Sequence, residues 1–125
     1  MSNDSLKDVL AGLQKSYLAS MPEKIRNLET LWADRKIELL KTDYHKLKGT
    51  GRTYGFPEIT ALGAAMERLC EIDQSSLERA VPISVKLMKR IGELRANGQA
   101  LDLDQEPDFK SIVSWVEAAD RKTGS

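Results

Sequence analysis

Residues 36–57 read KIELLKTDYHKLKGTGRTYGFP, and this stretch carries the helical pattern from which the fold can be worked out. Residues near one face of it recur at helical spacing; they are Ile37, Leu40, Tyr44, Leu47, Gly51 and Tyr54. Gly55 suits a helix C-cap, and Pro57 suits the first turn of a new helix. The stretch therefore predicts a helix from about residue 36 to residue 54, followed at once by another.

Apolar stripes at the same period continue on both sides of this stretch. On the N-terminal side we expect a helix from about residue 6 to residue 18, and Pro22 marks a break or first-turn position that opens a second helix. On the C-terminal side we expect helices at about 57–69, 77–94 and 107–121. They are separated by a turn at 73–76, by the Asn97-Gly98 stop and by an acidic connector at 102–108. The expected fold class is all-α: an antiparallel four-helix bundle with additional N- and C-terminal helices.

The length and the charge of the chain narrow the possible functions. With 125 residues the chain can bury a core of its own, and we expect a single helical domain over 1–125 with its core at about 22–97. Its 19 basic and 19 acidic residues cancel, so no global attraction to nucleic acid or to anionic lipid is expected. The only cysteine, Cys70, is expected to be a buried structural thiol.

The N-terminus lacks a basic-then-apolar signal pattern, and no window approaches the roughly 18 continuous apolar residues of a membrane span. The one cysteine, which has no partner for an internal disulfide, is also typical of a reducing compartment. We therefore expect a cytoplasmic protein that has no membrane contact.

His45 is the only histidine, and its helix is expected to present it to solvent. At about 100° per residue, Lys41, Lys48, Gly49 and Arg52 all lie within about 60° of it. A lone histidine usually has no chemical role, but Gly49 is unusual at an exposed helical position because glycine there costs roughly 1 kcal/mol relative to alanine. The missing side chain clears space beside the imidazole.

Basic residues gather around this histidine, with Lys41, Lys48 and Arg52 on its face and Lys46 nearby. A phosphoryl group carries roughly two negative charges and strong acceptor oxygens, so these cations would stabilise it. An exposed imidazole is largely neutral at cellular pH and offers one ring nitrogen as a nucleophile. No Gly-rich nucleotide motif is present, so the phosphoryl donor is expected to be another protein and not ATP bound to this chain.

These residues resemble the histidine phosphotransfer (HPt) domain family. The resemblance covers about residues 44–69, and its motif residues are His45-Lys46-Leu47-Lys48-Gly49, Gly55, Ile59, Leu62-Gly63 and Met66. It implies a four-helix bundle that relays phosphoryl groups between receiver-domain aspartates in a two-component phosphorelay, without kinase activity of its own. It also implies that His45 is the phosphoacceptor, that Lys48 helps neutralise the phosphoryl group, and that Gly49 leaves room for the imidazole and the receiver.

Glu67 stands on the next helix, at a position where some members of the family carry a glutamine near the histidine. The sequence does not tell whether its carboxylate faces His45.

The partners implied by the resemblance are receiver domains of response regulators or of hybrid sensor kinases. We expect Lys41, Lys46 and Arg52 to contact them. Mg²⁺ is expected on the receiver, and no metal or cofactor on this chain. The starting methionine and the lack of a kinase or receiver segment favour a standalone carrier, and a monomer is expected because nothing in the sequence specifies a dimer.

Other functions remain as alternatives to the relay. An HPt-like adaptor could dock receivers through the same basic face without carrying phosphate. A metal-dependent hydrolase is disfavoured because one His and one Cys form no ligand-spaced cluster. A nucleic-acid binder is disfavoured because the basic cluster is short and has no interleaved aromatic residues. The sequence does not identify the receivers, the direction of phosphate flow or the role of the C-terminal helix.

Overall fold

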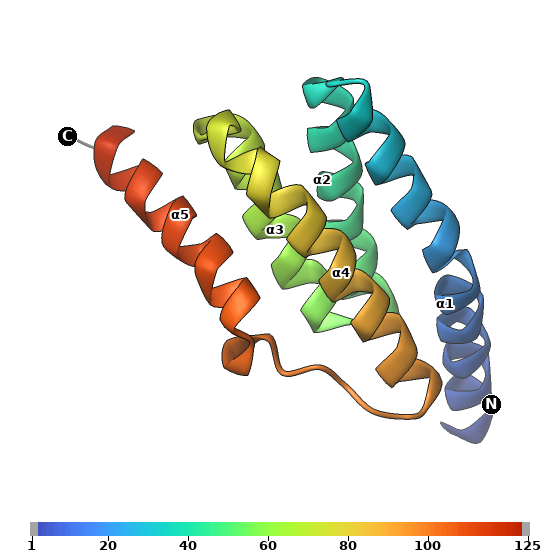
Figure 1. Cartoon of the computed structure of the whole chain (residues 1–125). Coiled ribbons are helices and arrows are strands. Elements are labelled where there is room, and N and C mark those ends of the chain that lie inside the picture. The colour runs from blue at the N-terminus through green and yellow to red at the C-terminus, as the bar shows by residue number, and fades with distance from the viewer. Residues whose placement is uncertain (1–2, 124–125) are drawn as a thin grey trace.

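The computed structural model describes residues 3–123, which form five α-helices (Figure 1). They are α1 (Asn3–Ala33), α2 (Ile37–Tyr54), α3 (Pro57–Ile72), α4 (Leu77–Ala96) and α5 (Pro107–Thr123). Two short 3-10 helices lie in the connections, η1 (Gln74–Ser76) and η2 (Leu103–Gln105). Helices α1 to α4 form an antiparallel bundle, and α5 packs outside it against α3 and α4. The predicted all-α class is confirmed.

The helix ends in the middle of the chain follow the glycine and proline signals. Gly55 ends α2 in the left-handed conformation, with φ at 83°, and its N–H donates to the Gly51 carbonyl. Pro57 occupies the first turn of α3. Gly98, with φ at 75°, follows the end of α4. The acidic connector contains η2, and the Asp102 carboxylate caps it by accepting from the Asp104 N–H.

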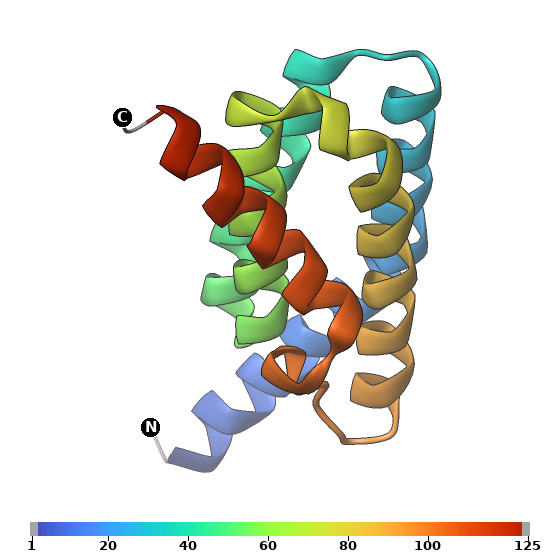
Figure 2. The ribbon, with the colours of Figure 1, turned by 60° about the vertical axis from the view of Figure 1, so that its left-hand side comes forward.

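The break predicted at Pro22 is wrong, because α1 continues through the proline as one helix. The predicted N-terminal extra helix is therefore the first part of α1. A proline inside a helix removes one hydrogen bond and pushes against the preceding turn, which bends the helix rather than always ending it. Figure 2 shows the first turns of α1 leaving the direction of the rest. Tyr17, Met21 and Ile25 are buried on one face across the proline, and this packing holds both halves against the bundle.

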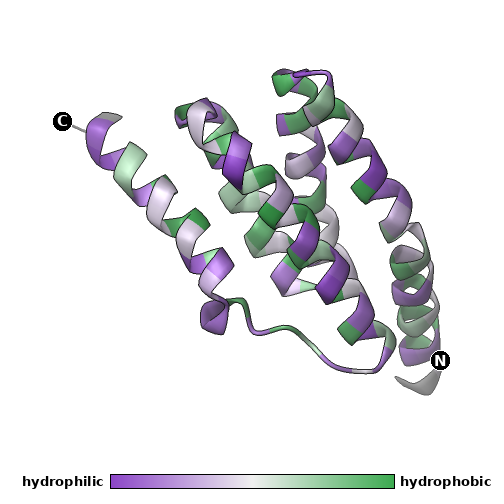
Figure 3. Cartoon of the chain, in the orientation of Figure 1, coloured by the Kyte–Doolittle hydropathy of each residue, from purple (hydrophilic) through white to green (hydrophobic). Residues whose placement is uncertain are grey.

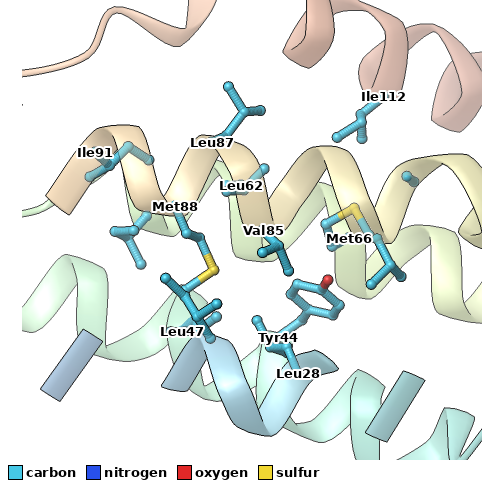
Figure 4. Close-up of a cluster of buried hydrophobic side chains, with 14 of the residues drawn as sticks. Leu28, Tyr44, Leu47, Leu62, Met66, Val85, Leu87, Met88, Ile91 and Ile112 are labelled. Atoms are coloured by element: carbon cyan, nitrogen blue, oxygen red, sulfur yellow. The ribbon is translucent and has the colours of Figure 1, made fainter. Parts of the chain in front are cut away.

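The core lies between the four bundle helices, and Tyr44 of α2 is at its centre (Figure 4). Its ring is fully buried, and its hydroxyl lies 2.6 Å from the Ser84 hydroxyl of α4. Ser84 in turn donates to the Val81 carbonyl at 2.8 Å. Burial raises the pKa of Tyr44 far above its ordinary value, although the Ser84 hydrogen bond opposes the change. Tyr44, the residue next to His45, thus ties α2 to the core.

Cys70 is buried, as predicted. Burial is the main reason that its pKa rises to about 12, so the thiol stays protonated near neutral pH. The residue is part of the core.

Helices α2 and α3 approach each other very closely because glycine stands at two points of contact. A Cβ atom at Gly63 would lie 2.7 Å from the Lys48 backbone nitrogen and 2.8 Å from the Tyr44 carbonyl oxygen. A Cβ atom at Gly51 would lie 2.7 Å from the Thr60 backbone nitrogen. Neither helix backbone can yield cheaply to an added carbon, so both glycines are required for this distance.

We predict that Gly63→Ala destabilises the protein by about 1–3 kcal/mol, because the added methyl group overlaps the α2 backbone. Urea denaturation followed by circular dichroism measures the change. Gly92→Ala is the matched control, since a Cβ atom there would meet Met21 Cγ at an ordinary 3.8 Å. The control should be neutral or gain up to about 1 kcal/mol from helix propensity. Equal stability of the native chain and Gly63→Ala would contradict the close-packing argument.

Candidate functional site

His45 lies in the middle of α2 on the side that faces solvent, where the helical period placed it. Its side chain is 64% exposed, whereas its neighbour Tyr44 is buried. The α2 stripe below it, which includes Leu40 and Leu47, is buried in the core. The imidazole is therefore presented to other molecules from a helix that the core holds in place.

Glu67 of α3 faces the histidine directly. Its Oε2 atom is hydrogen-bonded to His45 Nδ1, and its Oε1 atom accepts from Lys48 Nζ at 2.8 Å. Only 13% of the Glu67 side chain is exposed. Both carboxylate oxygens are thus engaged by groups of α2, and the carboxylate ties the site across the two helices.

The ionisation of Glu67 determines which ring nitrogen of His45 is available. Burial raises the pKa of this carboxyl, but hydrogen bonds and charge attraction from Lys48 and His45 outweigh the burial and leave the pKa below its ordinary value. Glu67 is therefore a carboxylate at neutral pH and can only accept hydrogen bonds. The proton of the His45–Glu67 bond then belongs to Nδ1, and the neutral imidazole has its lone pair on Nε2.

Two carboxylates of α3 neutralise two of the predicted cations. Lys48 pairs with Glu67 at 2.8 Å, and Lys41 pairs with Glu71 at 3.7 Å. Glu71 also accepts from Arg68 at 3.0 Å. Both lysine side chains are about one third exposed, so they remain within reach of a ligand at the surface.

The remaining predicted residues also lie on or beside this face. A Cβ atom at Gly49 would meet nothing within 4 Å, so the space beside the imidazole is open. Lys46 and Arg52 are exposed, and the described part of the chain offers neither of them an ion pair. Arg52 borders a hollow of about 330 Å³ between α2 and α3, which Lys48 and the small residues Ala61 and Ala64 also line.

The sequence predicts the residues that α2 contributes to the site, but not the contacts that α3 makes with them. The sequence locates Glu67 on the next helix without giving the direction of its side chain, and it gives no sign that Glu71 belongs to the site. Their spacing of four residues places both carboxylates on one face of α3. That spacing could have suggested a carboxylate row, but it could not have shown that the row faces Lys41, His45 and Lys48.

The C-terminal helix reaches the edge of this site through α3. Asp120 of α5 accepts from Arg68 at 2.6 Å, and Arg68 is the residue after Glu67. On α4, the Arg79 guanidinium lies 4.4 Å from the centre of the Trp115 ring of α5. Helix α5 therefore packs against α3 and α4 and meets the edge of the histidine site at Arg68.

Residues 3–123 contain neither a metal-binding cluster nor a membrane-spanning helix. No group of three or more His, Cys, Asp or Glu side chains in that range could hold a metal ion. No helix in the same range is long and apolar enough to cross a membrane.

The fold and the site together define a small helical bundle that exposes one histidine on the side of a packed helix. Comparison with protein-family models matches residues 12–105 to the Hpt domain, and the chain belongs to this family. Hpt domains act in phosphotransfer within two-component signalling, as phosphocarrier modules rather than kinases, and interact with receiver domains. Searches of curated proteins and of solved structures found no match.

We predict that Glu67→Gln flattens the acid side of the stability profile. The pKa of Glu67 is lower in the folded chain than in the unfolded chain. At pH values above the unfolded pKa, the charged carboxylate therefore stabilises the fold. This stabilisation is lost as the pH falls through the folded pKa. Urea denaturation between about pH 5 and pH 3 covers this window. Glu117→Gln, at an exposed position on α5, is the control and should keep the slope of the native chain. The same slope in all three proteins would contradict the assignment.

Proposed function

We propose that this chain relays a phosphoryl group between receiver-domain aspartates, with His45 as the phosphoacceptor. The observation that carries the proposal is the exposed imidazole whose Nδ1 is held by the partly buried carboxylate of Glu67. Because Nδ1 is engaged by Glu67, Nε2 is the ring nitrogen that remains to react with a partner. A scaffold that only docks receivers would need neither the oriented ring nor the open space at Gly49.

The transfer step follows from this geometry. The Nε2 lone pair attacks the phosphorus of an aspartyl phosphate on the receiver, the N–P bond forms, and the P–O bond to the aspartate breaks. The aspartate leaves as a carboxylate, while the Nδ1 proton stays on the ring, where Glu67 stabilises the positive charge that develops. The reverse sequence returns the phosphoryl group to a second receiver. Mg²⁺ would be held by the receiver in both directions.

Lys48 has two possible acceptors in this scheme. In the unphosphorylated chain its ammonium group is hydrogen-bonded to Glu67. A phosphoryl group on Nε2 adds roughly two negative charges one helical turn away, and charge-assisted hydrogen bonds to phosphoryl oxygens are strong. We expect the flexible lysine to turn toward the phosphoryl group. Lys41, Lys46 and Arg52 would attract the acidic surface of the partner.

His45→Gln should abolish phosphorylation, because glutamine has no nucleophilic ring nitrogen. The native chain and the variant are incubated with a phosphorylated receiver and Mg²⁺, and acid-labile, base-stable label on the chain is measured. Label on the native chain alone supports the relay. Absence of label from both chains across a panel of receivers, with binding retained, would instead support the docking adaptor.

Gly49→Leu should lower kcat/KM for transfer at least tenfold, which corresponds to about 1.4 kcal/mol. The added side chain enters open space in the free protein, so the fold tolerates it while the approaching receiver meets it. Transfer kinetics from a phosphorylated receiver measure the effect, and circular dichroism checks the fold. Thr53→Leu is the control, because Thr53 is exposed one turn further along α2. Similar losses in both variants would show that the Gly49 opening has no special role.

A further inference from the structure

The first turns of α1 expose an apolar stripe that the bundle does not cover. We call residues 5–16 the N-terminal arm. Five large apolar side chains are exposed in the part of the chain whose burial is described, and four of the five lie in the arm. They are Leu6 (56%), Val9 (60%), Leu10 (45%) and Leu13 (46%). Figure 2 shows this part of α1 extending away from the bundle, and Figure 3 shows hydrophobic residues recurring along it.

The attachment of the arm to the bundle begins near its end. Gln14 Nε2 donates to the Tyr54 carbonyl at 2.8 Å, and Tyr17 is buried against Tyr54 and Phe56. Most of the exposed stripe precedes residue 12, where the match to the Hpt domain begins. The stripe is therefore an addition to the domain and plays no part in its core.

We propose that the N-terminal arm pairs with the arm of a second copy of this chain, in antiparallel orientation, to form a weak symmetric dimer. The spacing of the stripe is the same when read in either direction. A two-fold axis between Val9 and Leu10 sets Leu6 of one copy against Leu13 of the other and Val9 against Leu10. Each apolar side chain then meets an apolar side chain, as a self-complementary interface requires.

The polar residues of the arm are compatible with this pairing. At 100° per residue, Asp8 and Lys15 lie on the side opposite the stripe and stay in water. Lys7 and Gln14 border one edge of the stripe, and the antiparallel arrangement places Lys7 near Gln14 of the second copy, so no like charges meet. The other edge is uncharged and small, and a Cβ atom at Gly12 would meet nothing within 4 Å.

Charge also favours a second copy over a membrane surface as the occupant. Helices that lie on anionic membranes carry an excess of Lys and Arg on their polar side. Here the arm carries Lys7 and Lys15 against Asp8, an excess of only one positive charge, and it has no Arg. The formal net charge of the whole chain is zero, so two copies do not repel each other strongly.

The size of the contact sets its strength. Four partly exposed side chains per copy are far fewer than the roughly 20–30 residues a side of a standard stable interface. The dimer should therefore form with a Kd on the order of 100 μM, as small interfaces usually give weak association. This inference departs from the monomer expected from the sequence.

Sedimentation velocity over a range of about 5 to 500 μM tests the proposal, because the range spans the expected Kd. The native chain should shift from monomer to dimer, and Leu10→Glu should remain monomeric throughout. Ala11→Glu is the matched control, since it adds the same charge at an exposed position on the back of the arm, and it should dimerise like the native chain. A native chain that stays monomeric over the whole range would overturn the proposal, as would equal effects of the two glutamates.

Cysteine cross-linking tests the antiparallel orientation. Val9→Cys places a thiol next to the two-fold axis, where it can reach its copy, whereas Leu13→Cys places it away from its copy. Cys70 is buried and does not compete. Oxidation should cross-link Val9→Cys much faster than Leu13→Cys; the reverse order or equal rates would overturn the antiparallel pairing. Binding of the monomeric native chain, but not of Leu10→Glu, to vesicles of phosphatidylcholine and phosphatidylserine would assign the stripe to membranes instead.

The dimer and the phosphorelay stand independently. His45→Gln removes the phosphoacceptor and leaves the arm unchanged, so it should dimerise like the native chain. Loss of dimerisation in this variant would overturn the assignment of the interface to the arm.

Discussion

The close contact between α2 and α3 is the constraint on which the site depends. Gly63 of α3 lets the α3 backbone lie against the backbone of Tyr44 and Lys48. Gly51 of α2 lets the α2 backbone lie against Thr60 of α3. At this distance a glutamate side chain on α3 reaches the histidine ring on α2. A wider spacing would leave Glu67 in water and would let the His45 ring rotate. The two glycines therefore act on the chemistry through geometry, without touching the imidazole.

Charge compensation across the same contact would suit the site to the phosphoryl group that we propose for His45. On an isolated α2 helix the positive charges of Lys41 and Lys48 would repel the other cations of this face. In the folded chain Glu71 neutralises Lys41, and Glu67 neutralises Lys48. Because these pairs are partly exposed, their rearrangement costs little. The histidine face can therefore be stable while empty and still offer cations to an incoming anion. Lys46 and Arg52 stay outside these pairs and are left to attract a partner.

The apolar stripe of α1 is exposed to solvent at the N-terminal end of the helix and buried in the bundle further along. Beyond Tyr17 its apolar stripe is buried in the bundle and continues across Pro22. Before Gln14 the same stripe runs past the end of α2 and α3 and meets solvent. A helix in water gains little from its own hydrogen bonds, so an apolar face of this kind is stabilised mainly by what packs on it. The same sequence pattern thus builds the core at one end of α1 and a surface for association at the other.

The sequence by itself determined the helices α2 to α5, the solvent-facing position of His45 and the opening at Gly49, because helical period, glycine and proline act locally along the chain. It predicted the wrong outcome at Pro22, where packing on both sides of the proline outweighs the local preference to end a helix. Only the tertiary structure decided that Glu67 faces His45 and that Glu71 faces Lys41. Those contacts join residues about 20 to 30 positions apart in the chain, and their direction depends on the rotation and spacing of two packed helices, which no local pattern records.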